Sequence, residues 1–199
     1  MLVKICGITT KEAAREAVTA GADFIGFVFA RSKRKIDPED VRQIVSTLPP
    51  SVKKVGVFVN ESRDKIVQIA DQAGLDYIQL HGDEPADFAE SLPYPVIKAF
   101  SIEKTEISAI NSYPCDYYLI DSPAGKYRGG NGTTFDWTLL KESRIDREKV
   151  ILAGGLNPQN IHEAITTARP AGVDVSSGVE TDGYKDLLKI KQFITNAKG

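Results

Sequence analysis

Eight short apolar runs, separated by helix-like segments along the whole chain, constrain the fold more than any other feature of this sequence. They are rich in β-branched and aromatic residues and cover 2–5, 24–29, 55–59, 77–80, 96–100, 117–120, 150–153 and 173–176. The runs are nearly continuous rather than alternating, which is typical of parallel strands buried on both faces. The sequence therefore predicts eight β-strands in a parallel sheet covered by helices.

Helical patterns fill the gaps between these runs. Thr9-x-x-Glu12 has the form of a capping box, and the alanines after it make an apolar stripe that ends at Gly21. Asn60 or Ser62 can cap another helix, which Gly74 ends. Further helices are expected after Asn157-Pro158, from Pro38, Pro85 and Phe135, and over residues 184–196.

Eight strands that are each followed by a helix predict an α/β protein, and closure into a single (β/α)₈ TIM barrel is the natural solution. Such barrels typically take about 250 residues, whereas this chain has 199. We therefore expect one compact catalytic domain over residues 1–199 with some short helices. The segment 103–112 has the weakest helical pattern.

Composition excludes several classes of protein. The net charge of −2 gives no electrostatic footprint for nucleic acid or a membrane surface, and no apolar run approaches membrane-spanning length. Two distant cysteines and two histidines share no ligand spacing, so no metal site is predicted. The opening residues lack the apolar segment of a signal peptide. We expect a cytoplasmic protein with free thiols.

Polar residues follow the apolar runs at the positions where a barrel builds its active site, the C-terminal ends of the strands. They are Cys6, 32–34, Asn60, His81, Asp121, Gly154-Gly155 and Ser176-Ser177-Gly178. The residues alone leave their roles open. Cys6, which precedes the permissive Gly7, is either a base or a buried inert thiol. Asp121 is either a partly desolvated general acid or a loop carboxylate.

Three further features admit a functional and a structural interpretation. Gly154-Gly155 and Ser176-Ser177-Gly178 follow the last two strands, where TIM barrels often bind phosphate through backbone N–H groups; the alternative is two ordinary turns. The basic cluster 31–35 either faces solvent or supplies an arginine for a substrate carboxylate. His81 is either a donor to substrate or a satisfied polar residue.

Several stretches occur together in one order. They are Lys4-Ile5-Cys6-Gly7-Ile8-Thr9, Gly26-Phe27-Val28-Phe29, Gly56-Val57-Phe58-Val59-Asn60, Gln79-Leu80-His81-Gly82, Ile120-Asp121, Gly129-Gly130-Asn131-Gly132 with Phe135-Asp136-Trp137, Leu152-Ala153-Gly154-Gly155-Leu156-Asn157-Pro158 and Asp174-Val175-Ser176-Ser177-Gly178-Val179-Glu180. The series spans nearly the whole chain and resembles the phosphoribosylanthranilate isomerases. The resemblance implies an Amadori rearrangement of a phosphorylated aminosugar in tryptophan synthesis, without cofactor or metal.

The resemblance also implies roles for individual residues. Cys6 corresponds to the general base and Asp121 to the general acid of that family. The family's carboxylate-binding arginine often stands in Ser-Pro-Arg, and Ser32-Lys33-Arg34 selects Arg34 here, although the missing proline leaves the shape of the loop open. Asp174 matches the last motif and either faces substrate or holds the strand turn. The family includes monomers and dimers, so either state is expected.

Three other kinds of barrel compete with this interpretation. A related isomerase of histidine synthesis would carry a pair of aspartates at strand ends, whereas the first strand here ends in Cys6. An indoleglycerol-phosphate synthase would need a lysine acid at a strand end, and Lys98 lies within a run. A barrel that binds a metabolite without catalysis is the remaining alternative.

Overall fold

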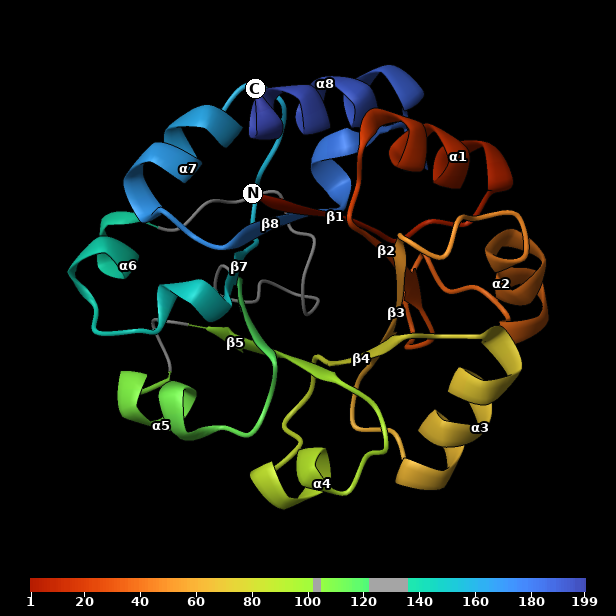
Figure 1. The fold of residues 1–199 in the computed structure, drawn as a ribbon, viewed down its shortest axis with the longest axis horizontal. Coiled ribbons are helices and arrows are strands. Elements are labelled where there is room, and N and C mark those ends of the chain that lie inside the picture. The colour runs from red at the N-terminus through yellow and green to blue at the C-terminus, as the bar shows by residue number, and fades with distance from the viewer. Residues whose placement is uncertain (102–104, 122–135) are drawn as a thin grey trace.

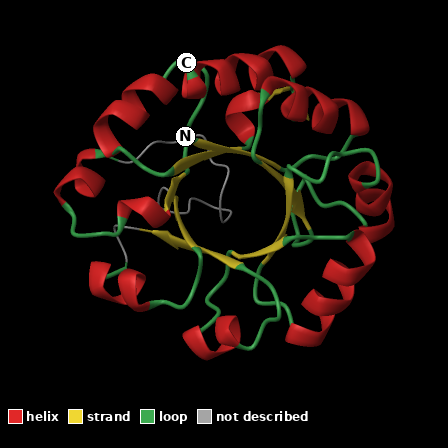
Figure 2. Cartoon of the chain, in the orientation of Figure 1, coloured by secondary structure: helices red, strands yellow, loops and turns green. Residues whose placement is uncertain are grey.

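The computed structural model describes residues 1–101, 105–121 and 136–199, and its eight principal strands close into a parallel barrel. Each strand pairs with the next along the chain, and the first pairs with the eighth. Figure 2 shows the strands as a closed ring with the helices outside it. The prediction of an α/β TIM barrel is therefore confirmed. The glycine-rich motif 129–132 and Phe135 lie outside the described residues.

The strands lie where the apolar runs predict them, with ends that differ by one or two residues. They are β1 (Leu2–Cys6), β2 (Phe24–Val28), β3 (Lys53–Phe58), β4 (Tyr77–Leu80), β5 (Val96–Ser101), β6 (Tyr117–Asp121), β7 (Val150–Leu152) and β8 (Gly172–Val175). Two of these differences matter for the site. Cys6 and Asp121 are the last residues of their strands rather than the first residues of the following loops.

Helices follow the strands around the outside of the barrel (Figure 1). They are α1 (Lys11–Ala20), α2 (Pro38–Val45), α3 (Arg63–Ala73), α4 (Ala86–Glu90), α5 (Ile107–Ser112), α6 (Thr138–Glu142), α7 (Ile161–Ala168) and α8 (Leu187–Lys198). The helices α4 and α6 have five residues each, as expected for a compact barrel. A 3₁₀ turn at Arg147–Lys149 precedes β7.

Three helix starts differ from the sequence prediction. The side chain of Thr10, not Thr9, caps α1 by accepting a hydrogen bond from the Ala13 amide. Asn157 caps only a turn, and α7 begins at Ile161. The last helix begins at Leu187 rather than at residue 184, because β10 (Tyr184–Lys185) pairs antiparallel with β9 (Glu180–Thr181).

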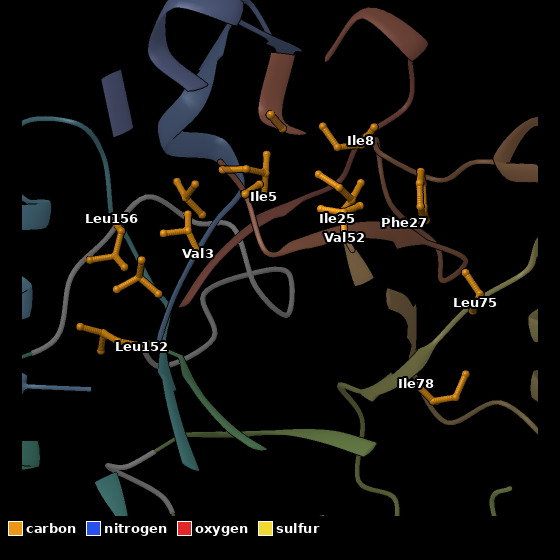
Figure 3. Close-up of a cluster of buried hydrophobic side chains, with 14 of the residues drawn as sticks. Val3, Ile5, Ile8, Ile25, Phe27, Val52, Leu75, Ile78, Leu152 and Leu156 are labelled. Carbon is orange, nitrogen blue, oxygen red and sulfur yellow. The ribbon is translucent and has the colours of Figure 1, made fainter. Parts of the chain in front are cut away.

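The alternation of the strands divides the core into two layers. Outward-facing side chains such as Val3, Ile5 and Ile25 pack against the helices, and Figure 3 shows them around the barrel wall. A smaller inner cluster fills the barrel; its buried members are Phe24, Val55, Ile97, Leu119, Ile151 and Ala153. Residues two positions apart on a strand share a face, so the inner cluster identifies which polar side chains also point inward.

Aromatic rings lie at the N-terminal end of the barrel interior. Phe24, Tyr77 and Tyr117 are the first residues of β2, β4 and β6, and the Phe24 ring centroid lies 5.5 Å from that of Tyr77 and 6.0 Å from that of Tyr117. The edge-to-face geometry is favourable for aromatic packing. This end of the barrel serves stability, which leaves the other end for polar side chains. Among the described residues, no helix is long and apolar enough to cross a membrane.

Candidate active site

The alternation of the strands turns Cys6 and Asp121 into the barrel at its C-terminal end. On β1, Ile5 belongs to the outer cluster, so Cys6 faces the interior. On β6, Leu119 belongs to the inner cluster, and Asp121 lies two residues further on the same face. Both side chains therefore project toward the same space from separate strands. This is the placement that proton transfers on one bound molecule require.

Cys6 is enclosed by its own strand and by β2. Its side chain is buried, with 7% of the residue's surface exposed. A Cβ atom at Gly26 would lie 2.9 Å from the Cys6 Sγ and 3.2 Å from the Lys4 Nζ, so only glycine leaves room for these two groups. Burial raises the pKa of the Cys6 thiol, and the attraction of the Lys4 ammonium opposes that rise.

Asp174 forms an ion pair with the buried side chain of Lys4. Its Oδ1 accepts a hydrogen bond from the Lys4 Nζ at 2.7 Å, and the Lys4 side chain has no exposed surface. Burial alone lowers the pKa of Lys4, but the interactions with Asp174 and Cys6 together raise it above its ordinary value. Of the two roles left open for Asp174, facing substrate or holding the strand turn, this ion pair with Lys4 on β1 supports the structural one.

His81 lies directly beside Asp121. Its Nε2 is 3.6 Å from the Asp121 Oδ2, and both side chains are mostly buried. The Gln79 Nε2 lies 3.0 Å from the His81 Nδ1. A neutral ring that accepts from Gln79 at Nδ1 carries its proton on Nε2, on the side of Asp121. His81 can therefore orient the carboxyl group or donate to a ligand bound next to it.

Arg34, the predicted carboxylate anchor, is held by Glu180. The Arg34 Nε and Nη2 donate to the two carboxylate oxygens at 2.6 and 2.8 Å, an arrangement that fixes the guanidinium plane. The stem of Arg34 packs over Gly7, where a Cβ atom would overlap its Cδ. Gly7 thus makes room for the stem of Arg34.

Lys185 completes this cluster from β10. Its Nζ lies 2.5 Å from a Glu180 oxygen and 2.9 Å from the Ser176 carbonyl oxygen. Burial by itself raises the pKa of Glu180, but the hydrogen bonds from Arg34 and Lys185 hold it below its ordinary value. Two cations surround one carboxylate, so the cluster keeps a net positive charge that favours an anionic ligand.

The two glycine-containing turns lie against each other. A Cβ atom at Gly178 would overlap the Leu156 carbonyl oxygen, which follows Gly154-Gly155. Both glycines of that pair have positive φ, +82° and +64°. Within the described residues, the amides of Gly154, Gly155, Ser177 and Gly178 donate no hydrogen bond to another described residue. These N–H groups are therefore available to an anion such as a phosphate.

Other polar features lie away from this end of the barrel interior. Lys98 neighbours the inward-facing Ile97 on β5, so it points outward, where it donates to Glu84 at 2.8 Å. A groove of about 530 Å³ lies on the outer side, lined by Thr9, Lys11, Lys35, Ile36, Asp37, Asp40, Gln43 and Ile44. The described residues contain no cluster of three His, Cys, Asp or Glu side chains arranged to hold a metal.

Sequence reasoning missed four residues of the site. Lys4 and Gln79 lie within apolar runs, and their charge and polarity inside a buried strand were the available signals. Glu180 ends a recognised motif but lies past the strand end. Lys185 had no local signal, because the hairpin that brings it to Ser176 was predicted as helix.

The sequence of this chain is similar to those of one known protein family. The sequence model of one family, described as N-(5'-phosphoribosyl)anthranilate (PRA) isomerase, matches residues 3–196. A relative from Oceanobacillus iheyensis, named N-(5'-phosphoribosyl)anthranilate isomerase, is 52% identical over 199 residues, which are 100% of this chain and 97% of the relative.

Solved structures agree with the sequence relatives. The phosphoribosyl anthranilate isomerase from Thermotoga maritima superposes with a TM-score of 0.89 at 46% identity, covering 100% of this chain and 99% of the other. A phosphoribosyl anthranilate isomerase in complex with reduced 1-(o-carboxyphenylamino)-1-deoxyribulose 5-phosphate superposes with a TM-score of 0.86 at 44% identity, covering 100% and 98%.

Proposed function

The chain belongs to the N-(5'-phosphoribosyl)anthranilate isomerase family, and we propose that Cys6 and Asp121 carry out the proton transfers of its reaction. The enzyme converts N-(5-phosphoribosyl)anthranilate into 1-(2-carboxyphenylamino)-1-deoxyribulose 5-phosphate, a step of tryptophan synthesis. Substrate and product are isomers, so catalysis requires that protons move and that no atom is gained or lost. An acid and a base are sufficient for this chemistry.

Asp121 acts first as the general acid. It gives its proton to the ring oxygen of the ribose, the C1′–O bond breaks, and the nitrogen lone pair forms a C1′–N iminium. Cys6, as the thiolate, then removes the C2′ proton, and the electrons of that bond give an enolamine. The C1′ carbon then gains the proton that Cys6 took and the enol proton passes to Asp121, which yields the ketone and returns both groups to their starting states. The inward projection of Cys6 and Asp121 from β1 and β6 is the observation that carries this proposal.

Two groups are proposed to hold the substrate by its charged ends. Backbone N–H groups of Gly154-Gly155 and Ser176-Ser177-Gly178 bind the phosphate, because they point to no partner among the described residues. Arg34 binds the anthranilate carboxylate with the guanidinium protons that Glu180 leaves free. His81 assists at the reacting sugar through its position 3.6 Å from Asp121.

The competing functions predict different site residues. A histidine-pathway isomerase would carry an aspartate in place of Cys6. An indoleglycerol-phosphate synthase needs a lysine acid that can reach substrate, whereas Lys98 faces outward and pairs with Glu84, and the inward-facing Lys4 is fully buried and pairs with Asp174. A barrel that only binds a metabolite would not need both a base and an acid turned into the same space.

We further propose a single catalytic domain over residues 1–199 that works in the cytoplasm without a cofactor or metal. All eight barrel strands fall within this range. The chain is proposed to be a monomer or a homodimer; the Thermotoga maritima relative is described as dimeric. The small phosphorylated substrate is the only partner that the site requires.

Turnover of the fluorescent anthranilate substrate by the purified protein tests the proposed function. We expect the substrate fluorescence to decay at a rate proportional to the enzyme concentration, without added metal or cofactor. Binding without turnover would support the non-catalytic barrel. Turnover of the histidine-pathway aminoaldose in place of the anthranilate compound would support the other isomerase.

A further inference from the structure

Lys4 is a fully buried lysine in the barrel interior. Its side chain has no exposed surface, which is rare for lysine unless the charge is compensated. The Asp174 carboxylate compensates it at 2.7 Å. The Lys4 ammonium has a second neighbour, the Cys6 side chain, with which its charge interacts.

The geometry around Gly26 places the Lys4 ammonium and the Cys6 sulfur near each other. A single point above Gly26, where a side chain would begin, lies 3.2 Å from the Lys4 Nζ and 2.9 Å from the Cys6 Sγ. Lys4 and Cys6 are two residues apart on β1, so both face the interior, with Lys4 one layer below. The ammonium therefore lies on the N-terminal side of the sulfur, inside the barrel.

We propose that Lys4 is a positioning residue for the catalytic base: its ammonium stands between the Asp174 carboxylate and Cys6 and stabilises the thiolate form of Cys6. The inference rests on the proposed role of Cys6. Asp174 holds the ammonium in place, and the remaining N–H bonds of Lys4 can point at the sulfur. When Cys6 takes the C2′ proton from the substrate, its negative charge disappears and Lys4 keeps its pairing with Asp174.

The charged groups that face Cys6 act in opposite directions. Lys4 and, more weakly, Lys185 favour the thiolate, whereas Asp174 and burial favour the thiol. Arg34 also interacts with the Cys6 charge from the loop after β2. Because burial raises the pKa of Cys6 overall, the loss of its nearest cation would leave a thiol that ionises only at still higher pH.

The test compares the ionisation of Cys6 in two variants that both lack the buried carboxylate. They are Asp174→Asn and Lys4→Met/Asp174→Asn, each made with Cys115→Ala so that Cys6 is the only thiol. Cys115 lies before β6 and its pKa is raised to about 12, mainly by burial, so its own thiolate would otherwise add to the absorbance. The ultraviolet absorbance of the thiolate is followed against pH, with a Cys6→Ser version of each variant as the blank.

We expect the midpoint of thiolate formation to lie at least about one pH unit higher in the double variant, which is a ~tenfold smaller thiolate fraction below the midpoint. Equal midpoints, or a lower midpoint without Lys4, would overturn the proposal when they occur both in this pair and in the matching pair that keeps Asp174. If the methionine variant does not fold, Lys4→Gln in the same background gives the same comparison, since glutamine also removes the charge. The titration needs no substrate, so its failure is distinct from a failure of the proposed isomerase activity.

Activity gives a second readout in the otherwise unchanged enzyme. In Lys4→Met, kcat/KM should fall by the same factor by which the thiolate fraction falls, and KM should change little. A residue that served the fold alone would lower the amount of active enzyme without moving the midpoint of the thiol titration. Loss of activity with an unchanged titration would therefore count against the proposal.

Discussion

The guanidinium of Arg34 and the carboxylate of Glu180 form a two-pronged ion pair, with Nε–Oε1 and Nη2–Oε2 distances of 2.6 and 2.8 Å. This pairing occupies one edge of the guanidinium and leaves the Nη1 protons and one Nη2 proton for another acceptor. Glu180 is itself fixed by Lys185. The orientation of the proposed carboxylate anchor is therefore set by Glu180, which Lys185 holds in turn.

Glu180→Gln should weaken substrate binding. The amide cannot accept from both Arg34 nitrogens as the carboxylate does, so we expect KM to rise about tenfold, the equivalent of about 1.4 kcal/mol, with kcat little changed. Arg34→Ala should raise KM further, because it removes the anchor itself. Glu39→Gln, which breaks the exposed pair with Arg42, is the matched control and should leave KM unchanged. If Arg34→Ala raised KM and Glu180→Gln left it unchanged, the orienting role of Glu180 would be refuted.

The phosphate site should depend on backbone more than on side chains. Gly155 has a φ of +64°, so Gly155→Val strains the turn and places a branched side chain beside its N–H group. We expect a large rise in KM and weaker inhibition by inorganic phosphate. Ser177→Ala removes one hydroxyl and should raise KM only modestly. A greater effect from Ser177→Ala would indicate that the hydroxyl, not the turn, binds the phosphate.

The buried pair between Glu84 and Lys98 should contribute strongly to stability. Their side chains are 3% and 5% exposed, so Glu84→Gln leaves a lysine charge in the protein interior and should cost about 3 kcal/mol in denaturant unfolding. The exposed pair between Glu39 and Arg42 provides the comparison, where Glu39→Gln should cost less than about 1 kcal/mol. Similar losses in the two variants would contradict the burial argument.

The same pair predicts how stability depends on pH. Burial raises the pKa of Glu84, but hydrogen bonds from Lys98 and the Asn60 amide lower it below the ordinary value of 4.5 overall. A carboxyl whose pKa is lowered in the folded state stabilises the protein at pH values above the ordinary pKa. This contribution is lost as pH falls through the folded-state pKa. As pH is lowered from 6, the free energy of unfolding should therefore fall less steeply in Glu84→Gln than in the unchanged protein.

The pH profile of kcat/KM should be bell-shaped. Carboxyls ordinarily ionise at lower pH than thiols. The pKa of Cys6 is raised, which moves the ionisation of the thiol still further above that of an ordinary carboxyl. The active state, with thiolate and carboxylic acid together, is then a minor one, and the alkaline limb reports Cys6. The profile measured in Lys4→Met should have its alkaline limb at higher pH. An alkaline limb that stays in place would assign it to another group.

Much of this architecture could be predicted from sequence because strand ends in a parallel barrel converge. Apolar runs locate β1 and β6 to within a residue, and Cys6 and Asp121 follow from that placement. The capping pattern was less decisive, since Thr9 and Thr10 both precede α1 and only backbone geometry selects Thr10.

Pairings between distant residues could not be predicted in the same way. Arg34 and Glu180 are far apart in sequence, and their contact depends on the shape of the loop after β2 and on the β9–β10 hairpin. Lys4 meets Asp174 because β1 closes the barrel against β8. Closure is a property of the whole sheet, so a local pattern could predict that these strands exist but not which buried charges they would pair.

Asp121→Asn tests the proposed acid. The amide keeps the shape of the carboxyl group but cannot donate an acidic proton to the ring oxygen, so kcat should fall by about 10²- to 10⁴-fold with KM little changed. His81→Asn, which removes the imidazole 3.6 Å from Asp121, should have a smaller effect on kcat. A larger loss in His81→Asn than in Asp121→Asn would transfer the acid role to the histidine.

The rate constant of Cys6→Ser tests the central claim most directly. A serine hydroxyl fits the same space beside Lys4 and Gly26 but is a far poorer base than a thiolate. Steady-state turnover of the anthranilate substrate should therefore show kcat lowered by at least about 10²-fold, with KM near that of the unchanged enzyme. A near-normal kcat in Cys6→Ser would contradict the assignment of Cys6 as the base and the proton-transfer mechanism built on it.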